Sequence, residues 1–188
     1  IDWPESLKEM QRNWIGKSIG AKVFFAIEGN EKNIEVFTTR PDTIFGVTFM
    51  TLAPELDLVQ EIVVSNQKDA VDTYIKETQQ RTQRERMADV KNITGVFTGA
   101  YAIHPFTGNR IPIWIGDYVL ADYGTGAVMA VPCGDQRDYD FAKHFNIPIT
   151  NIFKNVSIEE EAYTDKANTV LDQSDFLNGL SYKEAMLL

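Results

Sequence analysis

Residues 33–53 read NIEVFTTRPDTIFGVTFMTLA, and this stretch predicts two β-strands on either side of a proline turn. The runs 33–39 and 46–53 are rich in β-branched and aromatic residues, which favour strands. Pro41 fixes its own backbone and pushes Arg40 into an extended conformation, so the chain leaves the first strand straight before it bends. The stretch therefore combines sheet-forming sequence with a cluster of polar side chains at a strand end.

Runs of similar composition predict further strands: 21–27, 95–103, 110–120, 126–132 and 147–153. The segment 104–109, HPFTGN, is typical of a hairpin loop. Apolar residues at helical spacing predict helices over 55–66, 67–89 and 135–146. Ser181 and Glu184 form a capping-box pattern that opens one more helix. Strands interrupted by a helical pair predict a mixed α+β fold, with a curled β-sheet or small β-barrel core and peripheral helices, rather than a doubly wound sheet.

The composition is that of one folded domain over residues 1–188. Hydrophobic residues make up 44% of the chain and aromatic residues 11%, which is enough for a core. The single cysteine, Cys133, cannot form an internal disulfide, and no long apolar run is present, so a cytoplasmic protein without a membrane segment is expected. The segments 1–20 and about 175–188 resemble connections to an absent larger protein, as in an excised insertion domain.

The net charge of −9 has the wrong sign for a free-standing nucleic-acid binder. Residues 155–188 hold seven acidic and two basic residues, a net charge of 2 − 7 = −5. They are predicted to be a solvated tail. One cluster of basic residues is more simply interpreted as a solvated helix face than as a phosphate contact. Its members are Arg81, Arg84, Arg86 and Lys91. His104 and His144 lie far apart without metal-binding spacing, so no metal site is predicted.

The turn after the first quoted strand is a candidate binding site. At a strand end, the hydroxyls of Thr38 and Thr39 can converge on one ligand. Two adjacent threonines are also an ordinary β pair, and Asp42 with Thr43 after a proline is an ordinary turn or helix cap. From these residues alone, the structural interpretation is favoured.

A second polar stretch, residues 123–138, reads YGTGAVMAVPCGDQRD. A helix that begins at Asp135 places Asp138 on one apolar stripe with Phe141 and Ala142. The free N–H groups and the dipole of the first turn favour the ionised carboxylate, so Asp138 is predicted to remain an anion in a partly buried site. The alternative is that Asp135 caps the helix and Asp138 only complements its dipole.

The combination of these motifs is specific. TTRPDTIFG and IPIWIGDYVLADYGTGAVMAVPCGDQRDYDFA, preceded by TGVFTGAYAIHP and opened by NWIGKS, together resemble the editing domain, connective polypeptide 1, of bacterial-type leucyl-tRNA synthetases. The resemblance covers residues 14–149. It implies the synthetase editing-domain fold and hydrolysis of the ester of tRNA(Leu) mischarged with norvaline, isoleucine or similar amino acids. The family often has Pro-Gly-His-Asp-Gln-Arg-Asp where this chain has PCGDQRD, so a histidine-dependent mechanism is not expected.

The resemblance also implies roles for individual residues. Asp138 anchors the substrate α-ammonium, while Thr38 and Thr39 hold the ribose hydroxyls, the ester or the attacking water. Thr43 guards the side-chain end of the pocket against leucine. The other implied substrate-binding residues are Arg40 and Arg137, for phosphate or the tRNA end, Leu120, Tyr123, Met129 and Val131, around the side chain and adenine, and Asp42 and Asp135. No strong base is evident, so positioning of water and substrate, assisted by the vicinal hydroxyl of the adenosine, is the implied mechanism.

No cofactor is implied for the editing domain, because ATP serves only the absent synthetic core. The implied partners are the acceptor end of tRNA(Leu) with its terminal adenosine, the noncognate aminoacyl group and the rest of the synthetase, with no membrane. A binding-only module would lack Asp138 or the threonine hydroxyls, and both are present. A stand-alone deacylase is opposed by the net charge and by chain ends that look cut. An interaction domain without an active site is opposed by the polar clusters at two bends.

Overall fold

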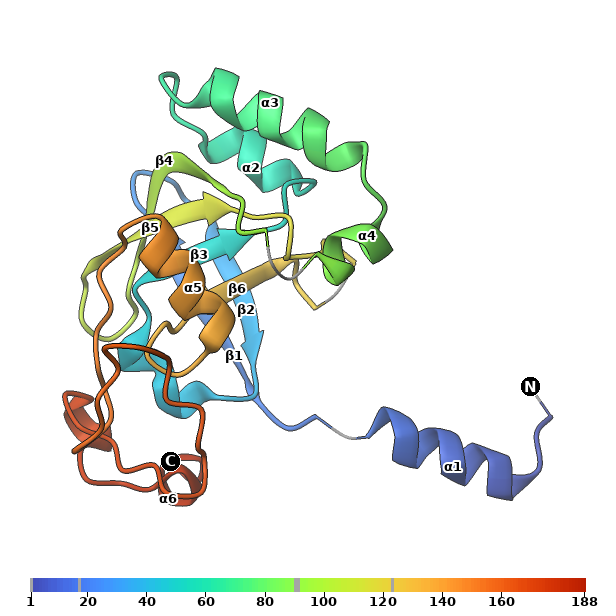
Figure 1. The fold of residues 1–188 in the computed structure, drawn as a ribbon, viewed down its shortest axis with the longest axis vertical. Coiled ribbons are helices and arrows are strands. Elements are labelled where there is room, and N and C mark those ends of the chain that lie inside the picture. Colours follow the sequence, from blue (N-terminus) through green and yellow to red (C-terminus); the bar gives the residue numbers. More distant parts are fainter. Residues whose placement is uncertain (1, 17, 90–91, 123) are drawn as a thin grey trace.

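The centre of the molecule is a strongly curled six-stranded sheet, described by a computed structural model for residues 2–16, 18–89, 92–122 and 124–188 (Figure 1). Its strands are β1 (Ala21–Ile27), β2 (Asn33–Thr38), β3 (Phe49–Leu52), β4 (Val96–Ile103), β5 (Arg110–Ile115) and β6 (Ala127–Ala130). They lie in the order β2-β1-β4-β5-β3-β6, with β3 and β5 parallel and the other neighbours antiparallel. The two outer strands, β2 and β6, contact each other, so the sheet nearly closes into a barrel. The predicted α+β class with a barrel-like core is confirmed.

The helices outside the barrel are α1 (Glu5–Ile15), α2 (Asp57–Ile62), α3 (Lys68–Gln79), α4 (Gln83–Ala88), α5 (Gln136–His144) and α6 (Tyr182–Ala185). Single 3-10 turns occur at Pro41–Gly46 and Asp175–Leu177. The segment α2–α4 carries the chain from β3 toward β4 and β5, which supplies the long connection that a parallel strand pair needs. The predicted helix 67–89 is wrong as one element, because Thr82 caps α4 in a capping box with Glu85 and so starts a new helix.

The strand β3 is buried on both of its faces. Met50 and Leu52 lie in the barrel core with Ile113 and Ile115 of β5. On the outer face Phe49 stacks on Phe141 of α5, with ring centroids 5.0 Å apart. Each such buried side chain stabilises the fold by about 1.5–3 kcal/mol. The packing of β3 against α5 therefore fixes the first turn of α5 against the barrel wall.

The hairpin of β4 and β5 has the predicted loop at 104–109 and one irregularity. The register shifts between Phe97 and Tyr101, where Gly99 has a φ of +81°. A Cβ at Gly99 would lie 2.0 Å from Cγ2 of Val64, so only glycine allows this close approach. The Val64 N–H donates to the Thr98 carbonyl at 3.0 Å, which ties the α2 segment to the barrel.

The predicted strand 147–153 is wrong. Phe153 makes only an isolated bridge to Leu171. The Asn151 side chain accepts from the Phe153 N–H at 3.0 Å and donates to the Val156 carbonyl at 2.8 Å, so it takes backbone groups that a ladder would use. The segment that follows is also less solvated than its charge predicts, since Leu171 and Leu177 are buried in the core.

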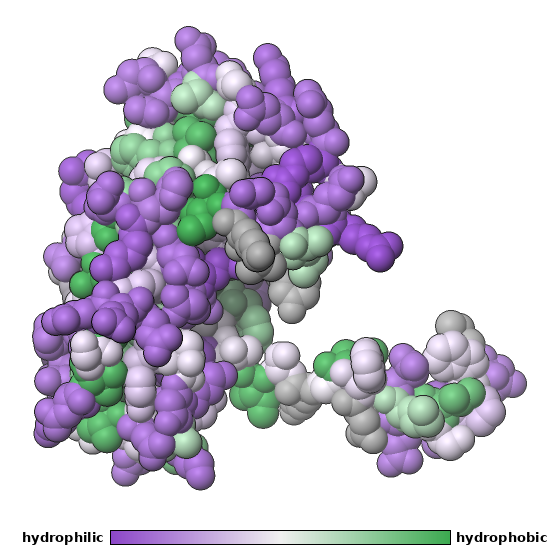
Figure 2. Space-filling view, in the orientation of Figure 1, coloured by the Kyte–Doolittle hydropathy of each residue, from purple (hydrophilic) through white to green (hydrophobic). Residues whose placement is uncertain are grey.

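The segment 1–20, predicted without a helix, contains α1. This helix projects away from the barrel (Figure 1), and Figure 2 shows apolar side chains on it. Met10 and Trp14 are among its exposed apolar residues. None of the helices in the described part of the chain combines the length and the apolar sequence needed to cross a bilayer.

Candidate active site

The turn after β2 is braced by its own hydroxyl groups. The Thr38 hydroxyl accepts from the Arg40 N–H at 3.0 Å, and the Thr43 hydroxyl donates to the Arg40 carbonyl at 2.9 Å. Arg40 has φ −127° and ψ 57°, so the prediction that Pro41 holds it in an extended conformation is wrong, and the chain already bends at Arg40. Thr43 is buried, so its hydrogen bond also fixes the rotamer of a side chain in the protein interior.

Arg40 and Asp42 form a bidentate ion pair. The Arg40 guanidinium donates to both Asp42 carboxylate oxygens at 2.8 Å, and it lies over the Tyr182 ring at 5.0 Å. The Asp42 side chain is fully buried and that of Arg40 is 16% exposed. Asp42 does not line the cavity described below; its contact is with Arg40. The positive charge of Arg40 is therefore already matched within the protein.

Asp138 lies in the first turn of α5, where Asp135 is the N-cap. The Asp135 carboxylate accepts from the N–H groups of Arg137 at 2.9 Å and Asp138 at 3.1 Å. The Asp138 Oδ2 accepts from the Val131 N–H at 2.8 Å. Asp138 is buried, but its Oδ1 has no hydrogen-bond donor among the described residues and is not sealed from solvent. One oxygen is thus fixed to the backbone, while the other is open to a ligand.

The protonation of Asp138 differs from the prediction. Burial raises the pKa of the Asp138 carboxyl to about 8, and the negative charge of Asp135 adds to the rise. The Val131 N–H and the positive charge of Arg137 lower this pKa without restoring its ordinary value. The prediction that the helix N-terminus keeps Asp138 ionised is therefore wrong for the empty site, because desolvation outweighs the local dipoles. A cation bound at Oδ1 would favour the ionised form again.

These residues share one cavity of about 300 Å³. That volume is at the lower end of the range of small-molecule sites, about 300–1,000 Å³. The cavity is lined by Thr38, Thr39, Arg40, Thr43, Met129, Val131, Gly134, Asp135, Asp138 and Lys166. Its buried members, Thr43, Met129, Val131 and Asp138, are called the floor below, and its exposed members, Thr39, Asp135 and Lys166, are called the rim. Two stretches far apart in sequence, 38–43 and 129–138, thus line the same cavity.

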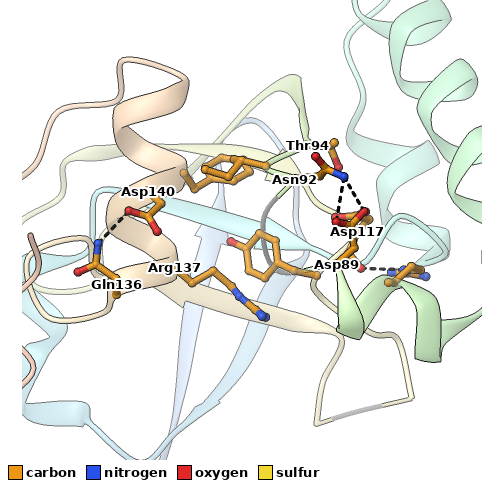
Figure 3. Close-up of a pocket in the computed structure, with 11 residues that line it drawn as sticks. Asp89, Asn92, Thr94, Asp117, Gln136, Arg137 and Asp140 are labelled. Atoms are coloured by element: carbon orange, nitrogen blue, oxygen red, sulfur yellow. Dashed lines mark hydrogen bonds between the residues drawn. The ribbon is translucent and has the colours of Figure 1, made fainter.

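Besides Asp42, three predicted residues lie elsewhere or outside the described residues. Arg137 lines a neighbouring pocket, where it lies 5.5 Å from the centroid of the Tyr118 ring. Figure 3 shows Arg137 and Asp140 of α5 on one side of that pocket and Asp89 and Asp117 on the other. Leu120 is half-buried and is not among the residues that line either pocket. Tyr123 lies outside the described residues.

Gly134 and Lys166 line the cavity but were not predicted from the sequence. Gly134 stands where the resemblance places the family's histidine, and its missing side chain could have been read from PCGDQRD. Lys166 lies in the segment predicted to be a solvated tail, and no local pattern singles it out. Only the folding of that segment against α5 brings Lys166 to the cavity.

Cys133 and His104 are residue types that can act as a nucleophile and a base, but here both are buried structural residues. Burial raises the pKa of the Cys133 thiol to about 11, so it is not a reactive thiolate. His104 is buried; its Nε2 lies 3.0 Å from the Ile44 carbonyl, and its Nδ1 accepts from the N–H groups of Phe106 and Thr107. Neither residue lines the cavity. Within the described residues, no group of three or more potential ligand side chains could hold a metal ion.

The sequence matches the family described as "Leucyl-tRNA synthetase, editing domain" over residues 12–187. This chain belongs to that family. Among editing-domain relatives, a leucine–tRNA ligase of Christiangramia forsetii is 66% identical over 186 residues, which cover 99% of this chain and 19% of the relative. One from Flavobacterium johnsoniae is 66% identical over 190 residues, covering 98% and 20%. The chain thus spans about a fifth of the length of these relatives.

The fold also resembles part of a solved structure. That structure is the ternary complex of Agrobacterium radiobacter K84 agnB2 LeuRS with tRNA and LeuAMS. It matches with a TM-score of 0.69 and 37% identity, over 82% of this chain and 18% of that chain. The likeness confirms the fold and its membership of a synthetase family.

Proposed function

We propose that this domain hydrolyses the ester of tRNA(Leu) mischarged with a noncognate amino acid. The observation that carries the proposal is one cavity that joins an open oxygen of the buried Asp138 to the Thr38–Thr39 pair. A hydrophobic synthetic pocket separates amino acids that differ by one methylene by only about 1–3 kcal/mol, so accuracy needs a second, hydrolytic site. For a leucine enzyme, the near-isosteres that escape are norvaline and isoleucine. The tRNA in the complex of the Agrobacterium relative supports an RNA substrate.

In this proposal, Asp138 binds the free α-ammonium of the aminoacyl group. The ammonium approaches Oδ1, while the Val131 N–H keeps Oδ2 in place. Because the empty carboxyl has a pKa of about 8, the ammonium takes the place of its proton at neutral pH. The Asp138 carboxyl, uncharged by itself, then forms an ion pair when it meets a substrate amine.

The threonines position the reacting groups. The Thr38 hydroxyl already accepts from the Arg40 N–H, so its own O–H is directed to another acceptor, such as the ester or ribose oxygen. A water molecule adds to the ester carbonyl carbon, the bond to the ribose oxygen breaks, and the ribose oxygen leaves with a proton from that water. Asp138, when paired with an ammonium, is a poor proton acceptor, so the rate comes from positioning, assisted by the vicinal hydroxyl of the adenosine. The step uses no cofactor, since ATP belongs to the synthetic core.

The test uses a full-length synthetase that carries this domain and norvalyl-tRNA as substrate. Asp138→Ala should slow deacylation roughly tenfold to a hundredfold, because hydrogen bonds to charged groups contribute about 1.5–3 kcal/mol. Asp140→Ala is the matched control, because Asp140 is on the same helix, is exposed and does not line the cavity. Near-normal deacylation by a folded Asp138→Ala enzyme would contradict the proposal. Intact norvalyl-tRNA after incubation with the unchanged enzyme would favour a module that only binds the acceptor end.

A further inference from the structure

The two arginines expected to meet the RNA are engaged elsewhere. Arg40 donates both arms of its guanidinium to the buried Asp42. Arg137 lines the neighbouring pocket and lies over the Tyr118 ring. Neither positive charge is presented to the cavity without a partner. A domain of net charge −9 therefore needs another cation if it is to accept the end of an RNA chain.

Lys166 is the cation that meets this need. It is exposed, it lines the cavity at the rim, and it forms no ion pair with any acid among the described residues. Lys166 is in the exposed rim of the cavity, whereas Asp138, the proposed ammonium anchor, is in its buried floor.

The segment before Lys166 is fixed to α5 and to the bend that precedes it. Three hydrogen bonds make this attachment: Tyr139 hydroxyl to Glu159 carbonyl at 2.6 Å, Ala162 N–H to Gln136 Oε1 at 3.0 Å, and Tyr163 N–H to Cys133 carbonyl at 2.8 Å. The Tyr163 ring packs on Phe153, with centroids 5.2 Å apart. The acidic tail is therefore a wall of the cavity, held by the same helix that carries Asp138.

The turn around Lys166 is also ordered. The Asp165 carboxylate accepts from the Ala167 N–H at 2.8 Å and from the Asn168 side-chain amide at 2.7 Å. The hydroxyl of Thr169, a buried residue, donates to the Asp165 carbonyl at 2.7 Å. The backbone is thus braced on both sides of Lys166, while the lysine itself is exposed at the rim of the cavity.

We propose that Lys166 is a substrate-positioning residue that binds the phosphodiester on the 5′ side of the terminal adenosine. The inference rests on the proposed function and deepens it. With the α-ammonium on Asp138 in the floor, the adenosine extends toward the rim, and its 5′ phosphate is the first anion to leave the cavity. A lysine ammonium offers three donors on a flexible stem, which suits a phosphate whose position varies by small amounts.

The experiment measures the affinity that a phosphate adds. A full-length synthetase is titrated with a non-hydrolysable 3′-(norvalylamino)-3′-deoxyadenosine, once with and once without a 5′-phosphate. In the unchanged enzyme, the phosphate should tighten binding roughly threefold to fivefold, the scale of a solvent-exposed ion pair. Lys166→Ala should remove this gain, and Lys166→Arg should retain it. Lys154→Ala is the control, because Lys154 is exposed in a nearby loop and does not line the cavity.

Each other outcome overturns the inference. A phosphate gain that persists in Lys166→Ala shows that another group holds the phosphate. Equal weakening of both analogues by Lys166→Ala places the lysine on the aminoacyl adenosine itself. If the unchanged enzyme fails to bind the phosphate-free analogue, or if Asp138→Ala binds it as tightly, the proposed function fails and the inference fails with it. The two failures are thus distinguished by which analogue reports them.

Discussion

The floor and the rim of the cavity are built in opposite ways. The floor consists of buried groups from the 3-10 turn after β2, from β6 and the residue that follows it, and from α5. Its key polar atoms, on Asp138 and Thr43, each bond to neighbouring backbone. The rim consists of exposed side chains, and its cation, Lys166, is on a segment without regular secondary structure. The floor is suited to selection of an amino acid by shape and charge. The rim is suited to a charged chain that must enter and leave.

The difference also concerns stability. A buried carboxyl with a raised pKa and a buried ion pair make the floor sensitive to any unmatched charge. The rim, in solvent, tolerates substitution with little effect on folding. The predictions below test this contrast, beginning with the largest expected change.

The ion pair of Arg40, which lines the cavity, with the buried Asp42 should give the largest loss of stability. Asp42→Ala leaves the Arg40 guanidinium, only 16% exposed, without its carboxylate. Breaking a buried pair in this way destabilises by about 3 kcal/mol. The free energy of unfolding in urea measures the effect. Glu28→Ala, which breaks the exposed pair with Arg110, should change it by less than about 1 kcal/mol; equal losses at the two sites would remove the contrast.

The pH dependence of stability should report on Asp138. Its folded pKa, about 8, lies above its ordinary value of 3.8, so the folded state retains a proton that the unfolded state releases between these values. Stability from this group is full below pH 3.8 and is lost as pH rises toward 8, by about 1 kcal/mol per pH unit. Asp138→Asn has no such loss, so its stability relative to the unchanged protein should increase by about 2 kcal/mol from pH 5 to pH 7.

Unfolding of both proteins at each pH measures this difference. Asp140→Asn, an exposed change on the same helix, should alter stability by less than about 0.5 kcal/mol at either pH. If the free energies of unfolding of Asp138→Asn and the unchanged protein differ by the same amount at pH 5 and pH 7, burial does not keep Asp138 protonated. A stabilising change at Asp138 that also removes activity would mean that this carboxyl is retained for function.

The floor could be predicted largely from local sequence. The strand pattern of residues 33–39, the proline turn and the helix after Asp135 each depend on neighbours in the chain, and the structure confirms them. The burial of Asp138 was also readable, because it shares a helical stripe with Phe141. Its protonation was not, since the degree of desolvation depends on how tightly the barrel closes around it.

The rim could not be predicted because it depends on contacts across the chain. Lys166 reaches the cavity only because Gln136, Tyr139 and Cys133 bind backbone groups of residues 159–163. Two of these bonds join a side chain to the backbone and one joins two backbone groups, and none of them leaves a periodic pattern in the sequence. The same cause explains the absent strand at 147–153, where Asn151 takes the backbone bonds. The engagement of Arg40 by Asp42 was likewise hidden, because the pair lies in the turn after β2, where no regular spacing predicts which side chains meet.

The preference for norvalyl-tRNA over leucyl-tRNA should change by about tenfold when the methyl group of Thr43 is removed. Thr43 is buried and its rotamer is fixed by the bond to the Arg40 carbonyl, so its methyl group is rigid. We expect this methyl to exclude leucine, which branches at Cγ, and to admit norvaline, because overpacking costs about 1–3 kcal/mol. Thr43→Ala should then hydrolyse leucyl-tRNA roughly tenfold faster while norvalyl-tRNA hydrolysis persists.

Two further variants separate the methyl group from the hydroxyl. Thr43→Val keeps the shape and should continue to spare leucyl-tRNA, whereas Thr43→Tyr should block the cavity for both substrates. Deacylation of the two charged tRNAs by the full-length enzyme measures all three. If Thr43→Ala spares leucyl-tRNA, discrimination depends on other floor residues, of which Met129 and Val131 are the candidates.

The attachment of the rim should give the smallest effect. Tyr139→Phe removes the hydroxyl that donates to the Glu159 carbonyl at 2.6 Å but keeps the buried ring, so it should destabilise folding by about 1 kcal/mol. Because this bond holds the segment that carries Lys166, the gain in affinity from a 5′-phosphate should decrease, while binding of the phosphate-free analogue stays the same. Tyr101→Phe is the control, since the Tyr101 ring lies beneath exposed Arg110, far along the chain from the tail. A loss of affinity for both analogues in Tyr139→Phe would show that floor and rim move as one unit, and the contrast drawn between them would then fail.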